Sequence, residues 1–143
     1  MNNFIQKEDY DASIHTEILN SLTRSDDAVI EICEDRAIAE MRSYMYSRYD
    51  CDAIFSATGN DRHPLVLMMA IDIAIYHLFC LHNPQKLSQI RKDRYDRAVE
   101  WLKSVSKGQI TIEGAPAAVV SDDTNQSAPM FNLRSNPPRH NRF

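Results

Sequence analysis

Apolar residues recur at intervals of three and four along most of the chain, the spacing that is typical of amphipathic α-helices. Ile14, Ile18 and Leu22 follow this spacing and predict a short helix over about residues 7–21, which we expect to break near Ser13. This helix would be the first packing element of a helical domain.

A longer helix is predicted over about residues 25–49. Ser25 can cap the free amides at its start, and Asp26 and Asp27 would lie at the positive end of the helix dipole. Acidic residues mark its solvated face, and its apolar stripe consists of Val29, Ile30, Cys33, Ala37, Met41, Tyr44 and Met45. A helix of about 24 residues spans roughly 36 Å, which is long for a domain of this size, so we expect it to be the backbone of the bundle.

Residues 50–62 are polar and contain a turn signal at Gly59, so we expect a loop there. Pro64 then begins a third helix that ends near Leu81, because proline suits the first turn of a helix. This helix is apolar nearly all round, and other helices must therefore surround it. Since Asp72 interrupts the run and its length falls short of the roughly 20 residues that cross a bilayer, we interpret it as a core helix.

A fourth helix is predicted from Pro84 to Lys107, where Gly108 permits a left-handed closing residue. Its polar face is basic, and we expect it to attract the acids of the second helix. The basic residues are Arg91, Lys92, Arg94, Arg97 and Lys103.

The character of the chain changes after Gly108. Residues 109–114 alternate between polar and apolar and predict a short β-like segment. The remainder holds four of the six prolines, and such a composition cannot bury enough apolar surface to offset its ordering entropy. We therefore predict an all-α protein, a four- to five-helix bundle over residues 1–112, with an extended C-terminal arm over residues 113–143 that is disordered unless bound. The predicted core contains Met68, Ile71, Ile75, Leu78, Tyr95, Val99 and Leu102.

Charge divides the chain into an acidic body and a basic end. The net charge of −4 lacks the basic excess that drives phosphate binding, which disfavours a nucleic-acid reader. The last ten residues, in contrast, contain Arg134, Arg139 and Arg142, have no acid and end in Phe143. We expect these four residues to be the arm contacts, docking on acidic surfaces of neighbouring subunits.

No pattern in the sequence predicts catalysis, a cofactor or a metal. Cys33, Cys51 and Cys80 form no CxxC pair, and reduced thiols in a cytoplasm fit best. His77 and Cys80 lie on one face of the predicted helix, whereas His82 points away from that face. The three residues could therefore supply at most two ligands to a metal ion. Glycine-rich phosphate-binding loops and a secretory signal are not found, and the adjacent carboxylates are best explained as solvated charge. We therefore expect a non-enzymatic protein.

Asp72 is the one acid within the apolar third helix. An unpaired buried carboxylate costs several kcal/mol, so it needs a cation, an amide partner or a proton. We predict a structural ion pair with Arg48, with Arg42 or Arg97 as the alternatives. A role as a general base is the less favoured interpretation.

Two stretches resemble a known family. They are DIAIYHL at residues 72–78 and RYDRAVEWL at residues 94–102, the latter followed by Lys107 and Gly108. In this order and spacing they are similar to the Mu-like phage family of small head-tail connector, or head completion, proteins. The resemblance covers about residues 4–114, and the arm beyond it departs from the family pattern.

The resemblance implies a helical adaptor in the virion, at the head-tail junction. Such an adaptor would form a homo-oligomeric, twelvefold ring on the portal protein, offer a docking surface to tail or further connector proteins, and let DNA pass without sequence-specific binding. No active site and no membrane contact are implied. The alternative is a cytoplasmic regulatory or nucleic-acid-binding module that uses the basic fourth helix, residues 91–103; a small hydrolase is a third class that a pocket with convergent polar groups would favour.

Overall fold

The computed structural model describes residues 3–118 of the 143-residue chain. Over these residues the chain is an all-α bundle, as the hydrophobic pattern predicts. It contains five α-helices and three short 3-10 helices: η1 (Lys7–Ala12), α1 (Thr16–Thr23), α2 (Asp27–Met45), α3 (Cys51–Ser56), η2 (Gly59–Asp61), α4 (Pro64–His82), η3 (Pro84–Lys86) and α5 (Gln89–Ser106).

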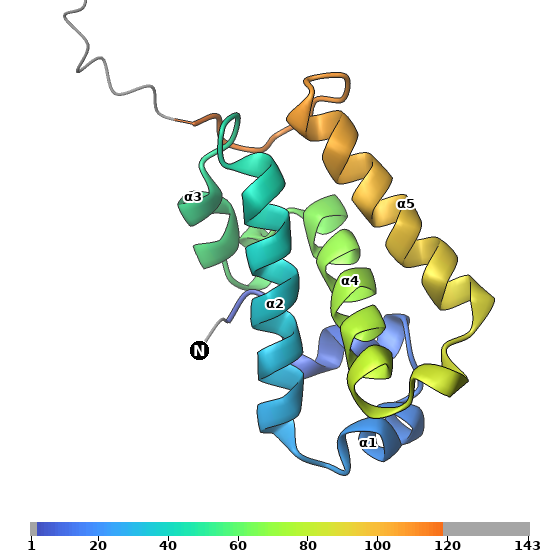
Figure 1. Ribbon diagram of the computed structural model, residues 1–143. Helices are drawn as coiled ribbons and strands as arrows, with labels where there is room; N and C mark the ends of the chain where they lie inside the picture. Colours follow the sequence, from blue (N-terminus) through green and yellow to red (C-terminus); the bar gives the residue numbers. More distant parts are fainter. Residues whose placement is uncertain (1–2, 119–143) are drawn as a thin grey trace, which may run out of the picture.

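Helix α4 is the centre of the bundle. Figure 1 shows α2, α4 and α5 side by side, with α4 running opposite to the other two, and α1 packed across the end at which α2 begins. More than half of α4 is buried, including Val66, Ile73, Ile75 and Leu78, none of which is exposed to solvent. By length and composition α4 could also cross a membrane, but a core helix meets the same criteria. Its burial here fits the core interpretation.

Local signals place the helix starts. Asp26 accepts a hydrogen bond from the Ala28 amide at the start of α2, and Ser88 accepts one from the Arg91 amide at the start of α5. The predicted break near Ser13 is confirmed, because η1 ends at Ala12 and α1 begins at Thr16. Helix α5 begins at Gln89, later than expected, since residues 84–86 form the separate η3 turn.

The predicted loop at residues 50–62 is wrong in its first half. Helix α2 ends at Met45, and a further short helix, α3, follows it. Asp50 caps α3 by accepting a hydrogen bond from the Ala53 amide. Phe55 of α3 is buried, and its ring packs edge-on against Phe4 with centroids 5.1 Å apart. Six residues are too few to show a helical period, and the aromatic partner comes from the distant N-terminal segment.

The predicted core is correct at Ile71, Ile75, Leu78 and Leu102, which are all buried. Tyr95 and Val99 are only half-buried, because they lie at the edge of the α4–α5 contact. The prediction for Met68 is wrong, because 42% of its surface is exposed.

The segment after α5 returns across the end of the bundle, where Figure 1 shows it passing toward α3. It forms no strand; within residues 3–118 the β-structure is one isolated antiparallel bridge, Tyr49 to Ala117. The Asp50 amide donates to the Pro116 carbonyl at 2.9 Å, and the Ala118 amide donates to the Arg48 carbonyl at 3.0 Å. Backbone hydrogen bonds therefore attach residues 116–118, which were predicted to belong to the arm, to the end of the bundle. The predicted arm contacts Arg134, Arg139, Arg142 and Phe143 lie outside the described residues.

Candidate functional site

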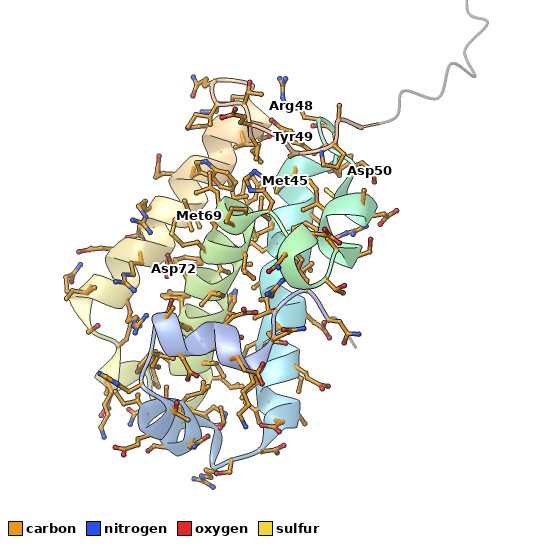
Figure 2. All side chains as sticks on the ribbon, turned by 180° about the vertical axis from the view of Figure 1, so that it is seen from behind. Met45, Arg48, Tyr49, Asp50, Met69 and Asp72 are labelled. Carbon is orange, nitrogen blue, oxygen red and sulfur yellow. The ribbon has the colours of Figure 1, made fainter. Side chains whose placement is uncertain are left out.

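Asp72 is buried, as expected, but its partner is not Arg48. Its side chain is 3% exposed, and its Oδ2 lies 3.1 Å from Nη2 of Arg97 on α5. Arg94 lies farther away, with 4.0 Å between its Nη1 and Oδ1 of Asp72. Figure 2 shows Asp72 midway along α4 and Arg48 at the end of the bundle. The Arg48 prediction is wrong because Arg48 lies beyond the end of α2, whereas Asp72 lies midway along α4.

Arg48 has a different role, at the C-terminal end of α5. Its Nε donates to the carbonyl of Ser106 at 3.0 Å, one of the carbonyls that the helix leaves without an amide partner. Its guanidinium also packs directly against Gly108, which has a φ of +74°. Close by, Tyr49 accepts a hydrogen bond from the Ile112 amide at 2.8 Å. These contacts join the end of α2 to the start of the C-terminal segment.

A second polar cluster joins α2, α4 and α5. The Glu40 carboxylate accepts a hydrogen bond from the Tyr95 hydroxyl at 2.9 Å and lies 3.1 Å from Nε2 of His77. Burial, together with Glu40, raises the pKa of Tyr95 above its usual range, so the phenol remains a donor. The ring of Tyr76 stacks on that of Tyr95 with centroids 3.8 Å apart.

This cluster can hold three helices together, but its geometry does not support nucleophilic catalysis. The Nε2 atom of His77 is engaged with Glu40. The exposed Cys80 interacts with Tyr76, whose pKa rises above its usual range chiefly through its hydrogen bond to that thiol. A nucleophile needs a base that it contacts and that a third group orients. Among residues 3–118, no group of three or more His, Cys, Asp or Glu side chains could hold a metal ion.

A third polar contact is fully internal. The Tyr10 hydroxyl donates to Oε1 of Glu34 at 2.8 Å, and both residues are buried. Burial raises the pKa of Glu34 to about 7, while the hydrogen bond from Tyr10 acts in the opposite direction. The sequence pattern indicates a solvated face for the acids of this helix, but Glu34 is buried because η1, which contains Tyr10, covers this part of α2.

A hollow of about 730 Å³ on the described surface lies between α1, the end of α4 and the start of α5. We call it the α1–α5 groove. Its apolar lining comes from Ile14, Ile18, Leu22 and Phe79. Ile18 is 44% exposed, so apolar surface is open to solvent here. The groove was not predicted from the sequence, because it exists only where α1 packs across the α4–α5 connection.

The rim of the α1–α5 groove is cationic. Arg24, Lys86 and Arg91 line it, against one acid, Glu17. None of the three cations forms an ion pair with a carboxylate of residues 3–118. Arg91 donates from Nη2 to the Ser13 carbonyl, while its buried Nη1 has no partner within the described part of the chain. Burial lowers the pKa of Arg91, as expected for a cation that is poorly solvated and unneutralised.

The described residues thus form a helical body with internal ion pairs and an apolar groove that has a cationic rim. The family model described as Bacteriophage Mu, Gp36 matches residues 4–130. The chain belongs to this family. Membership of the Gp36 family makes it a phage protein and confirms the resemblance to a Mu-like phage family. The match reaches beyond residue 114, so the Gp36 family pattern includes part of the segment that follows the helical body.

No curated protein and no solved structure matches this Gp36-family chain. Its role must therefore be argued from its own surfaces.

Proposed function

We propose that this Gp36-family chain is a non-enzymatic structural subunit of a tailed-phage virion. In this role it is a head-tail connector, or head completion protein, that forms a ring beneath the portal protein and presents the next docking surface to tail proteins. The observation that supports this best is the placement of two binding features at opposite ends of one small bundle. The α1–α5 groove lies where α5 begins, and the C-terminal segment leaves beside Arg48, where α5 ends.

Features at opposite ends favour heterologous contacts between copies. In such a contact one surface of a subunit meets a different surface of the next, and the assembly closes into a ring when the rotation between subunits allows it. A twelvefold ring would match the symmetry that the family resemblance implies for the portal. A two-fold dimer would instead need one surface that is complementary to itself.

The charge distribution fits passage of DNA through such a ring. Residues 113–143 hold three acids and three arginines, so the net charge of −4 belongs entirely to residues 1–112. An acidic body does not retain a phosphate backbone, and DNA would pass without sequence-specific binding. The basic residues Arg134, Arg139 and Arg142 would then dock on the acidic body of a neighbour or of the portal.

The alternative of a nucleic-acid-binding module on α5 is less favoured by the contacts of that helix. Arg97 and Arg94 face Asp72, and Lys103 lies 3.7 Å from Glu100. Their charges are therefore partly balanced within the protein, and few remain to release counterions from DNA. Tight binding to double-stranded DNA at physiological salt, in a gel-shift assay, would favour the alternative.

Joining of heads and tails in extracts tests the proposed function. When the gene for this chain is deleted from its phage, the infected cells should produce DNA-filled heads and free tails that do not join. Adding the purified full-length chain should restore infectious particles, because the missing component is a separate structural subunit. Negative-stain electron microscopy with a labelled chain should place it between head and tail. A block before DNA packaging, or a label found elsewhere, would contradict the proposal.

A further inference from the structure

The α1–α5 groove combines two properties, an apolar floor and a cationic rim. Its floor is apolar and partly exposed at Ile18, and its rim holds three cations without a carboxylate partner among residues 3–118. A ligand that fits must cover apolar side chains and bring negative charge beside them. A bare phosphate backbone supplies the charge but not the apolar part.

The chain itself contains a segment with that chemistry just past the described residues. Residues 119–123 are two valines followed by Ser121, Asp122 and Asp123. The valines match the apolar floor, and the two carboxylates match the cations of the rim. Beyond residue 118 these are the only acids in the sequence.

We propose that the α1–α5 groove is the docking site for residues 119–123 of a neighbouring copy of this chain. The inference rests on the proposed function and specifies the contact that joins one subunit of the ring to the next. The valine side chains cover Ile14 and Ile18, and the two aspartates lie beside Arg24, Lys86 and Arg91.

The geometry requires the occupant to come from another copy. Ala118 is hydrogen-bonded to Arg48, beside the end of α5, whereas the groove lies at the start of that helix. Helix α5 has 18 residues and spans about 27 Å at 1.5 Å per residue. Asp122 is four residues beyond Ala118, which an extended chain covers in at most about 14 Å. A subunit therefore cannot place its own Asp122 on its own groove.

Charge reversal on the two sides of the contact tests the proposal in the full-length chain. The groove variant is Arg24→Glu with Lys86→Glu, both exposed side chains without an ion-pair partner among the described residues. The arm variant is Asp122→Lys with Asp123→Lys. A matched control, Arg36→Glu with Lys107→Glu, changes the net charge as much as the groove variant does but lies away from the groove.

Sedimentation velocity, with the chain alone and with portal protein, measures self-association. Each reversed variant should associate on the order of tenfold more weakly, because two attractive pairs become repulsive. An equimolar mixture of the two variants should regain wild-type association, since every contact between the two kinds of copy again pairs opposite charges. One chain with all four changes should also regain it, and the control should behave as wild type.

Several results would overturn the proposal. The proposal would be contradicted if the mixture of the two variants self-associated as weakly as each variant alone. It would also be contradicted if the arm variant self-associated normally while the groove variant did not. A chain that stays monomeric with and without portal protein also contradicts it, and so does a groove variant whose one defect is lost DNA binding. The proposed function fails separately: if the chain is absent from the head-tail junction but the mixture still rescues association, the docking site stands and the connector role does not.

Discussion

Arg48 occupies the space in which a Cβ on Gly108 would lie. Atoms of its guanidinium come within 2.6 to 2.7 Å of that position, closer than real Cβ contacts allow. The same side chain donates to Ser106, so one arginine fixes the end of α5 and depends on a glycine to fit there. The start of the C-terminal segment, residues 109–118, is placed by this contact.

Gly108→Ala should therefore destabilise the bundle more than an ordinary loop substitution. Its φ of +74° alone costs an alanine about 1–2 kcal/mol, and moving the flexible end of Arg48 away from Ser106 should add roughly 0.5–1.5 kcal/mol, the net value of a hydrogen bond. Urea unfolding measures the difference. Gly114→Ala is a close control, because Gly114 has a φ of +79° with nothing near its Cβ position. In an Arg48→Ala background the two glycine variants should lower the free energy of unfolding by the same amount. If Gly108→Ala still lowered it more than Gly114→Ala, a contact other than Arg48 would be responsible.

Replacing Arg97 by alanine should lower the free energy of unfolding by about 1–2 kcal/mol. Asp72 would remain buried with only Arg94, at 4.0 Å, to balance its charge. The loss is limited because the Arg97 side chain is 56% exposed and solvent screens the pair. Asp72→Asn should make the same arginine substitution nearly neutral. A second double-mutant cycle, with Arg48→Ala in place of Arg97→Ala, serves as the comparison. A coupling free energy between Asp72 and Arg48, with none between Asp72 and Arg97, would refute the pairing.

The buried Glu34 should make stability depend on pH. Its pKa is about 7 in the folded protein, against 4.5 for a fully solvated glutamate, so the native state binds more protons than the unfolded state between these values. The corresponding stabilisation is present below pH 4.5 and is lost as the pH rises to about 7, by on the order of 3 kcal/mol at most. Glu34→Gln should flatten this part of the profile, measured by urea unfolding between about pH 4.5 and 8. Glu8→Gln, at an exposed position of η1, should leave it unchanged; an unaltered profile in Glu34→Gln would contradict the assignment.

Removing the basic end of the chain should impair assembly and not folding. The triple variant Arg134→Ala, Arg139→Ala, Arg142→Ala deletes interfacial charges that can each contribute on the order of 1 kcal/mol, repeated in every subunit of a ring. We expect fewer filled, tailed particles and an unchanged melting temperature of the purified chain by circular dichroism. A normal particle yield would refute an essential basic end, and a lowered melting temperature would show that this end belongs to the fold.

The secondary structure of the long elements and the fold class could be predicted from the amino-acid sequence. Helices α2 and α5 are predicted by their helical period, and α4 is predicted by the apolar run that follows Pro64. These predictions need no tertiary information, because each depends only on the order of residues within one segment. The sequence also identified Asp72 as a buried acid, since its neighbours on both sides are apolar. The two motifs that contain Asp72 and Arg97 were sufficient to indicate the family that the comparison confirmed.

The partner of Asp72 was accessible in part from the sequence. Two antiparallel helices joined by a short connection bring together residues at similar distances from it: Asp72 is ten residues before the end of α4, and Arg97 is eight residues after the start of α5. Arg97 was among the alternatives, and the first choice was Arg48, at the end of the predicted second helix. Helix α2 does lie along α4, since Glu40 contacts His77, but Arg48 follows the end of α2 and is far from Asp72, midway along α4.

Tertiary structure alone decided the remaining features. Short segments such as α3 and η1 have too few residues to show a period, so their burial depends on what packs over them, as Phe4 packs on Phe55 and Tyr10 on Glu34. The α1–α5 groove likewise has no local signature, because its lining comes from segments that lie more than 50 residues apart at the extremes. A linear pattern records how a segment prefers to fold, whereas a surface is created by the packing of segments on one another.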